Sequence, residues 1–213
     1  MTNLIQATAG NRPVFNLSGD DYGVEFNVSD NPQYLVAPVP TAMGGATAYT
    51  YAGWFYRAGN LDQFNGFPTL FGLTVDGGSA TGSSGIQFSS GDVYVSPLGG
   101  SKGNFASVPI DPWFPENTWV HLAAHIITNT GSKFFVNGVE RDVMTNGSAA
   151  LPATFDNVSL SIGAARDGAR PTPIRASNLQ LWNIALTDQQ VQDWAMPRLT
   201  GTLPSGLVGY WPL

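Results

Sequence analysis

A serine between glycines is the first group in this sequence that could carry chemistry. Residues 99–103 (GGSKG), centred on Ser101, match the G-x-S-x-G pattern of a serine nucleophile. That nucleophile needs a strand, a sharp turn and a following helix. The next twelve residues, 104–115, contain three prolines and no helical period. The pattern therefore predicts a loop and no catalytic serine.

The two histidines of the chain, His121 and His125, could act as metal ligands. On a strand they share one face but lie about 13 Å apart, at about 3.3 Å per residue. One metal ion cannot bind both side chains across that distance. We therefore expect His121 to be a buried, hydrogen-bonded structural residue.

Acidic residues could hydrolyse a glycosidic bond if two carboxylates stood about 5–10 Å apart across it. Glu140 and Asp142 form the one same-face acidic pair on a clear predicted strand. The turn at Asn137-Gly138 places Lys133 opposite Asp142, which predicts a cross-strand ion pair. We therefore expect no enzymatic activity, and a glycoside hydrolase is the least favoured of three functional hypotheses.

The stretch 119–143 positions these residues and organises the chain. Residues 119–128 are nearly all apolar or β-branched, which predicts a strand buried on both faces. Asn137-Gly138 is a strong hairpin signal, because a type I′ turn needs positive φ at both positions. Strands over 133–136 and 139–144 should therefore pair antiparallel.

The rest of the chain predicts further strands and one short helix. Residues 22–28 alternate, with Val24 and Phe26 inward and Glu25 outward. Other strands are expected at 46–57, 69–75, 86–88, 93–95, 159–162, 179–182 and 208–211.

The helix begins after Thr187, whose side chain forms a capping box with Gln190. Because it has only about two turns, it must dock on the sheets through Val191 and Trp194.

Composition limits the classes of function. The 213 residues, with 43% apolar and 12% aromatic, are compatible with one all-β domain at 13–213 after an N-terminal arm at 1–12. Charged residues make up 11%, against roughly 25% in typical soluble domains, so a neutral polar surface or covering partners are expected. A net charge of −6 argues against nucleic acid and anionic membranes as partners. The chain has no cysteine, and no apolar run predicts membrane insertion.

The order W-x-H-x-A, a glycine turn and F-V-N-G resembles the laminin-G-like domains of the concanavalin-A-like jelly-roll superfamily. Segments 155–163 (FDNVSLSIG), 178–186 (NLQLWNIAL) and 207–213 (LVGYWPL) are similar to later strands of that family. The resemblance implies an all-β fold: an antiparallel two-sheet jelly-roll sandwich with one short C-terminal helix.

Calcium is the ligand that the resemblance implies first. Asp30 matches one acidic position of the family's site, whereas Arg175-Ala176-Ser177-Asn178 stands where the family has a G-x-I-D element. We therefore expect either no cofactor or a structural calcium ion held by Asp30.

A glycan site would use exposed aromatic rings and polar loops. Trp113 and Phe114 lie between prolines, although such a loop can also fold its aromatics into the core. Arg166, Asp167, Arg170 and Arg175 are expected in one Gly/Pro-containing loop that could recognise acidic sugars or an acidic partner, or could simply be solvated.

Our first functional hypothesis is a non-enzymatic structural or adhesive protein of a tailed-phage virion, either a capsid decoration or a tail-fibre component. Its expected partners are other virion proteins, copies of itself and cell-surface glycans. Residues 1–10 lack the basic and apolar regions of an export signal, which suggests a virion surface released by lysis. The alternative is a free carbohydrate-binding or adhesion module.

Overall fold

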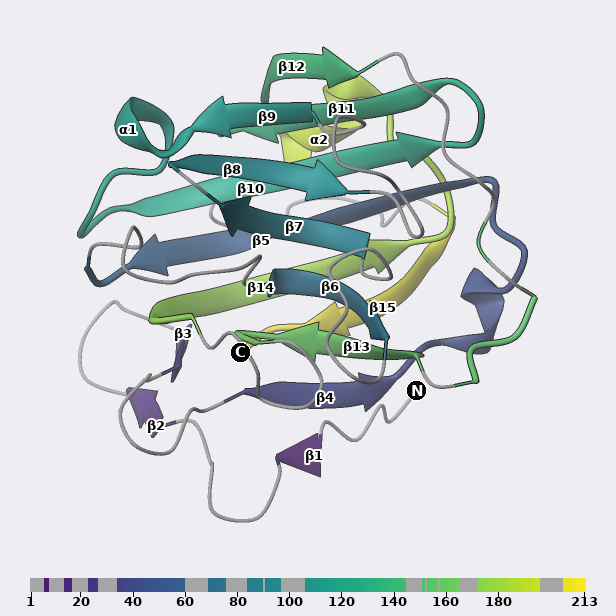
Figure 1. Cartoon of the computed structure of the whole chain (residues 1–213), viewed down its shortest axis with the longest axis horizontal. Helices are drawn as coiled ribbons and strands as arrows, with labels where there is room; N and C mark the ends of the chain where they lie inside the picture. Colours follow the sequence, from purple (N-terminus) through teal and green to yellow (C-terminus); the bar gives the residue numbers. More distant parts are fainter. Residues whose placement is uncertain are drawn as a thin grey trace.

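A computed structural model gives the fold. It describes residues 6–7, 14–16, 23–26, 34–59, 69–75, 84–89, 91–96, 106–144, 151, 153–156, 158–164, 172–195 and 205–213. Two antiparallel sheets stack face to face, as the sequence predicts (Figure 1). Within these ranges, no helix is long and apolar enough to cross a membrane.

The smaller sheet has seven strands and lies in front in Figure 1. Its spatial order is β1 (Gln6–Ala7), β4 (Leu35–Pro38), β13 (Val158–Ile162), β6 (Thr69–Val75), β7 (Ser84–Ser89), β8 (Asp92–Ser96) and β9 (Ala106–Pro109). β1, which lies in the predicted N-terminal arm, pairs with β4 at one edge.

The larger sheet has eight strands. Along its main path the order is β12 (Val139–Met144), β11 (Gly131–Val136), β10 (Trp119–Ile127), β5 (Ala48–Arg57), β14 (Ile174–Trp182), β3 (Gly23–Phe26) and β2 (Val14–Asn16). β15 (Leu207–Trp211) pairs with the second half of β14, on the edge where the first half pairs with β3.

The main core fills the space between the sheets. Alternate residues of β5 and β10 point into it, including Tyr49, Tyr51 and Phe55 from β5 and Leu122 from β10. The intervening residues of both strands point to the opposite side of the larger sheet, which we call its outer face. Ala52 and Ala123 belong to a second apolar cluster on that face. β10 is therefore buried on both faces, as predicted.

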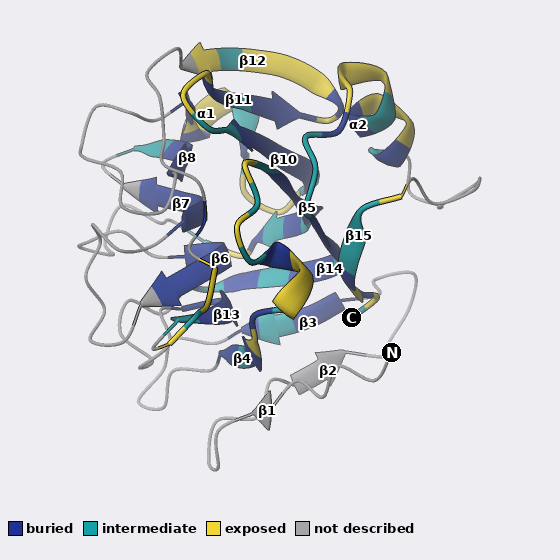
Figure 2. Ribbon diagram, turned by 90° about the vertical axis from the view of Figure 1, so that its right-hand side faces the viewer, coloured by how far each residue is buried: buried dark blue, intermediate teal, exposed yellow. Residues whose placement is uncertain are grey.

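The predicted helix, α2 (Asp188–Trp194), packs on the outer face. Thr187 accepts a hydrogen bond from the Gln190 backbone N–H, and the Gln190 side chain accepts one from the Thr187 N–H, so the capping box is confirmed. Val191 and Trp194 are buried in the second cluster. Figure 2 shows this helix on the side of the larger sheet away from the smaller one.

Several elements differ from the sequence prediction. Two additional helical turns form, η1 (Thr41–Met43) and α1 (Ile110–Trp113). β9 forms at 106–109, where the sequence predicts no strand, and β14 begins five residues before the predicted position 179. For these two strands, pairing with a neighbouring strand extends the backbone where local sequence preference is weak.

Candidate functional site

A row of aromatic and charged side chains crosses one end of the outer face. Trp119 of β10 is the register partner of Tyr56 of β5. Tyr56 is the partner of Arg175 of β14, and Arg175 is the partner of Glu25 of β3. Directly paired residues point to the same side of a sheet, so four adjacent strands place four side chains in one line.

The members of this row touch one another. The rings of Tyr56 and Trp119 lie 5.6 Å apart, and the Arg175 guanidinium carbon lies 4.9 Å from the Tyr56 ring centre. Arg175 Nε lies 3.2 Å from Glu25 Oε2. The Tyr56 hydroxyl donates to Asn117 Oδ1 at 3.2 Å. Trp119, Tyr56 and Arg175 are all half-buried, so each keeps part of its surface in solvent.

The sheet is concave at this row. A Cβ atom on Gly23 of β3 would lie 2.7 Å from Trp119 Cη2. β10 and β3 are separated by β5 and β14, a span of about 14 Å in a flat sheet. An indole cannot cross that span unless the strands curl toward each other. The Trp119 indole itself lies across this curved part of the sheet, and glycine at position 23 makes room for it.

Trp54 and His121 form the next row inward, with ring centres 5.6 Å apart. Trp54 is half-buried, whereas His121 is 1% exposed. Burial lowers the pKa of His121 to about 3, so the ring is neutral at physiological pH. Neither ring nitrogen has a hydrogen-bond partner in the described structure. His121 is therefore buried as predicted, but the prediction that it is hydrogen-bonded is wrong. We call Trp54, Tyr56, Trp119, Arg175 and Glu25 together the open end of the outer face.

The other end of the outer face lies beneath α2 and contains Ala52, Ala123, His125, Phe135 and Trp182. All five are at most 2% exposed, and we call them the covered end. The Trp182 and Trp194 rings lie 5.8 Å apart, which ties the sheet to the helix. His125 packs 4.6 Å from the Phe135 ring. Its pKa falls to about 4, chiefly because of burial. This end has no accessible aromatic surface.

The acidic residues of β12 do not form the predicted pair. A β-bulge makes Arg141 an extra residue, so Phe134 pairs with Asp142 and Lys133 with Val143. Asp142 accepts a hydrogen bond from the Ser107 backbone N–H at 2.7 Å, which joins β12 to β9 of the other sheet.

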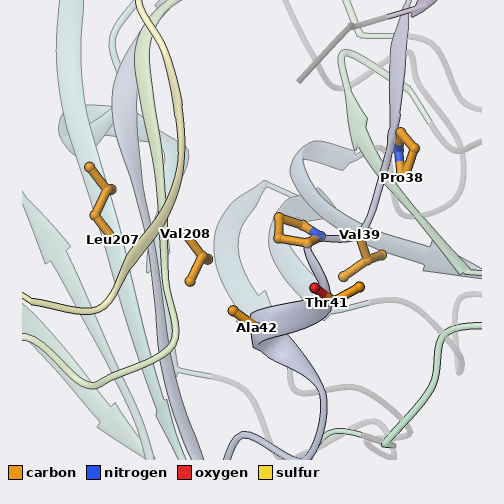
Figure 3. Close-up of a pocket in the computed structure, with 7 residues that line it drawn as sticks. Pro38, Val39, Thr41, Ala42, Leu207 and Val208 are labelled. Carbon is orange, nitrogen blue, oxygen red and sulfur yellow. The ribbon is translucent and has the colours of Figure 1, made fainter. Parts of the chain in front are cut away.

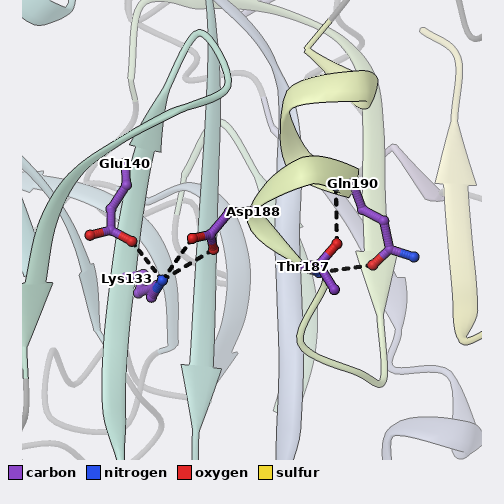
Figure 4. Close-up of polar contacts among 5 residues, drawn as sticks. All are labelled: Lys133, Glu140, Thr187, Asp188 and Gln190. Carbon is purple, nitrogen blue, oxygen red and sulfur yellow. Dashed lines mark hydrogen bonds and ion pairs between the residues drawn. The ribbon is translucent and has the colours of Figure 1, made fainter.

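Lys133 instead lies 2.6 Å from Glu140 and 3.0 Å from Asp188, the first residue of α2 (Figure 4). Hydrogen bonds to these two carboxylates raise the pKa of Lys133. The predicted ion pair between Lys133 and Asp142 is therefore wrong, and Lys133 pairs with Glu140 instead. Glu140 is directed toward Lys133 and the helix, whereas Asp142 is directed toward Ser107 of the other sheet, so the two carboxylates are separated.

The aromatic loop at Trp113 and Phe114, which the sequence offers either as a glycan site or as a loop folded into the core, lies elsewhere, beside β9. Phe114 is 0% exposed and belongs to the main core, so it offers no ring face to a ligand. Trp113 is half-buried, and the Arg141 guanidinium carbon lies 3.9 Å from the centre of its ring. That side of the indole is already occupied. Phe114 is therefore too buried to contact a glycan, and one face of the Trp113 ring is already covered by Arg141.

The remaining predicted site residues, Asp30, Arg166, Asp167 and Arg170, lie outside the described residues. The segment 175–178, expected to correspond to the family's second calcium element, lies within β14, so Arg175 belongs to a strand and not to the predicted loop. Ser177 Oγ donates to the carbonyl oxygens of Pro212 and Leu213 at 3.3 and 3.0 Å, and Asn178 Oδ1 accepts from Tyr210. No group of three or more acidic or histidine residues in the described ranges could hold a metal ion. These residues do not fit a calcium site, and the role of Asp30 stays a prediction.

A cavity of about 390 Å³ lies at the edge of the sandwich, between the β4–η1 segment and β15 (Figure 3). The side chains that line it are apolar except for the hydroxyl of Thr41: Pro38, Val39, Pro40, Ala42, Leu207 and Val208. None of these lining residues is aromatic, so the cavity offers no ring on which a sugar could pack, and the open end is the better candidate site.

Sequence reasoning did not identify the open end, although the sequence contains a signal for it. The β5 sequence AYTYAGWFYR has aromatic residues at both parities, which predicts aromatic rings on both faces. A helix of seven residues is about 10 Å long, whereas a nine-residue strand is about 30 Å long. One short helix therefore cannot cover all the aromatic rings on the outer face.

Comparison with known proteins agrees with the fold. A sequence model of the concanavalin A-like lectin/glucanases superfamily, Laminin_G_3, matches residues 29–192. A search among curated proteins gives no match.

Three solved structures illustrate the similarity. A candidate carbohydrate-binding protein from Bacteroides ovatus has a TM-score of 0.63 and 17% identity, over 88% of this chain and 50% of that one. The binding domain of Paraclostridial Mosquitocidal Protein 1 has a TM-score of 0.59 and 13% identity, over 91% and 47%. Domain 4 of AbnA, a GH43 extracellular arabinanase from Geobacillus stearothermophilus solved with arabinotriose, has a TM-score of 0.52 and 19% identity, over 91% and 88%. This chain spans about half the length of the first two structures, and at these identities the likeness shows the fold alone.

Proposed function

Because this chain belongs to the concanavalin A-like lectin/glucanase superfamily, we propose that it is a non-enzymatic carbohydrate-binding protein that holds glycans on the open end of its outer face. The observation that carries the proposal is the concave row of Trp119, Tyr56, Arg175 and Glu25. This row combines accessible aromatic rings with polar groups.

The chemistry of a sugar matches this arrangement. The C–H face of a pyranose ring is apolar and packs on an aromatic ring, while its hydroxyls need hydrogen-bond donors and acceptors. Tyr56 and Trp119 supply rings, Glu25 supplies carboxylate oxygens, and Asn117 supplies an amide beside the Tyr56 hydroxyl. Because Tyr56, Trp119 and Glu25 sit on strands, their positions are set before a ligand binds.

The placement of the carboxylates and the similar solved structures both favour binding over hydrolysis. Glycoside hydrolysis uses two carboxylates on either side of the scissile bond. Glu140 and Asp142 are turned toward different partners by the bulge, and Glu25 is ion-paired with Arg175. The AbnA domain solved with arabinotriose and the binding domain of the mosquitocidal toxin lend support to a binding role.

A glycan array followed by titration of the best ligand tests the proposal. Trp119→Ala should weaken binding about tenfold, because one aromatic contact is worth about 0.5–1.5 kcal/mol beyond its area. Trp113→Ala is the matched control, since that indole lies beside β9 and should leave affinity unchanged. The thermal unfolding of both variants should be recorded to confirm that they fold.

Two outcomes would contradict the proposal. A protein that binds no glycan on the array does not have this function. If Trp113→Ala abolishes binding and Trp119→Ala does not, the site lies in the loop that the sequence predicts.

We also propose that the protein acts on the surface of a virus particle, among other virion proteins. The content of 11% charged residues supports this, because such a surface suits extensive contacts with neighbouring subunits. Exposed Val139 and Val143 on the edge strand β12, each 45% exposed, offer one such contact. Co-sedimentation with particles from the native source would support the location, and recovery of the protein solely as a free species would contradict it.

A further inference from the structure

We infer that the open end selects uncharged glycans and discriminates against glycans that carry a carboxylate. This inference rests on the proposed function and adds the chemical class of the ligand. It follows from the way in which the open end neutralises its one basic side chain.

Arg175 is held on two sides. Its Nε atom lies 3.2 Å from Glu25 Oε2, and its guanidinium carbon lies 4.9 Å from the centre of the Tyr56 ring. Its side chain is 20% exposed. A guanidinium recognises a carboxylate best through a bidentate edge, and Glu25 already approaches that group. A carboxylate on a ligand would have to displace Glu25 or share Arg175 with it.

Glu25 is the more accessible member of this ion pair, with 36% of its side chain exposed. It stands at the end of the row, next to Arg175, where the polar groups of a sugar packed against Trp119 and this row would lie. A neutral hydroxyl can donate to this carboxylate. A carboxylate on the same sugar cannot, and it would also be repelled by a like charge in a half-buried setting.

The other described basic side chains do not change this balance. Four basic residues, including Arg175, lie in the described ranges. Besides Arg175, Arg57 is ion-paired with Asp111, Lys133 lies between Glu140 and Asp188, and Arg141 stacks on Trp113. The net charge of −6 adds a general repulsion for anionic ligands.

The test uses matched oligosaccharide pairs that differ by one carboxylate. Glycans that end in galactose or glucose are compared with their C6-oxidised counterparts, which end in galacturonic or glucuronic acid. For the wild-type chain, the neutral member of each bound pair should bind about tenfold more tightly at low salt. The ratio should shrink at high salt, because ions screen the repulsion.

Glu25→Gln should reduce this ratio several-fold, since it removes the repelling charge and frees Arg175 to pair with the ligand. Glu140→Gln is the matched control, because it makes the same chemical change beside Lys133, away from the open end, and should leave the ratio unchanged.

The outcomes separate the two levels of the proposal. If the oxidised members bind as tightly as the neutral ones, or more tightly, the inference is overturned and the carbohydrate-binding function stands. If no member of any pair binds, the proposed function fails and the inference fails with it. Binding that Trp119→Ala does not weaken places the site elsewhere and overturns both statements about the open end.

Discussion

Both ends of the outer face carry aromatic rings, but the rings differ in how far they are exposed to solvent. At the covered end, Ala52, Ala123, Phe135 and Trp182 are at most 1% exposed. At the open end, Trp54, Tyr56 and Trp119 are half-buried, although they lie on the same sheet. The difference arises because α2 has seven residues and is shorter than the strands beneath it. One short helix thus divides a single apolar face into a structural part and an accessible part.

The two ends also treat polar groups differently. Beneath and beside the helix, His125 Nε2, Gln180 Oε1 and Trp182 Nε1 are buried without a partner in the described structure. At the open end, Arg175 pairs with Glu25 and Tyr56 with Asn117. An unpaired buried polar atom costs about 1–3 kcal/mol. The covered end therefore gains stability from apolar burial in spite of its unpaired polar atoms. At the open end the charged and hydroxyl groups are paired, although His121 beside Trp54 is buried without a partner in the described structure.

The largest expected effect compares one tryptophan from each end. Trp182→Ala should lower the free energy of unfolding by about 3–5 kcal/mol, because it removes a fully buried indole under α2. Trp119→Ala should lower it by clearly less, because that indole is half-buried. Denaturant titration of both variants measures the difference. Equal losses would show that the open end is as structural as the covered end.

Acid should destabilise the fold through the buried histidines. The folded pKa values of His121 and His125, about 3 and about 4, lie below the unfolded value of about 6.5. Between pH 6.5 and 4.5 the unfolded chain therefore binds more protons, and stability falls as the pH falls. The loss of unfolding free energy is at most about 1.4 kcal/mol per pH unit for each histidine. His121→Phe should reduce the slope of unfolding free energy against pH, and an unchanged slope would contradict this origin.

Gly23→Ala should disturb the open end selectively. The added Cβ would lie 2.7 Å from Trp119 Cη2, so the indole must move away from β3. We expect a stability loss of about 1–2 kcal/mol, typical of overpacking, together with weaker glycan binding. Gly59→Ala is the control, since nothing lies within 4 Å of its added Cβ. If both variants behave alike in calorimetry, Trp119 is not held by Gly23.

The smallest effect concerns the cap of the covering helix (Figure 4). Thr187→Ala removes the side chain that accepts from the Gln190 backbone N–H and should lower the unfolding free energy by about 1 kcal/mol. Thr187→Ser keeps the hydroxyl and should restore most of it. Thermal unfolding of the two variants measures the contribution of the cap to stability. If Thr187→Ser is as unstable as Thr187→Ala, the loss comes from the threonine methyl group and not from the hydroxyl.

Local chemistry in the sequence was sufficient for several elements. The tight turn at Asn137-Gly138 forms with positive φ at both residues, and Val136 pairs with Val139 beside it as predicted. The capping box and the buried faces of α2 were also predictable, because each depends on residues a few positions apart.

Other features depend on contacts between distant segments. The bulge at Arg141 has no local sequence signal, yet it moves the partner of Lys133 from Asp142 to Val143. It coincides with the Arg141 stack on Trp113 and the hydrogen bond from Ser107 to Asp142, which join β12 to segments about 30 residues earlier in the chain. As a result, Arg141 of the same chain covers one face of Trp113 in the predicted glycan loop.

The sequence by itself determined the two-sheet sandwich, its central hairpin and its short helix, because alternation, turn chemistry and capping act over a few residues. Only the tertiary structure decided which aromatic rings remain accessible. Trp119, Tyr56, Arg175 and Glu25 come from four strands spread over about 150 positions, and they meet in one row because strand order and register place them there. That placement depends on the long-range pairing of the strands, which cannot be deduced from any one strand.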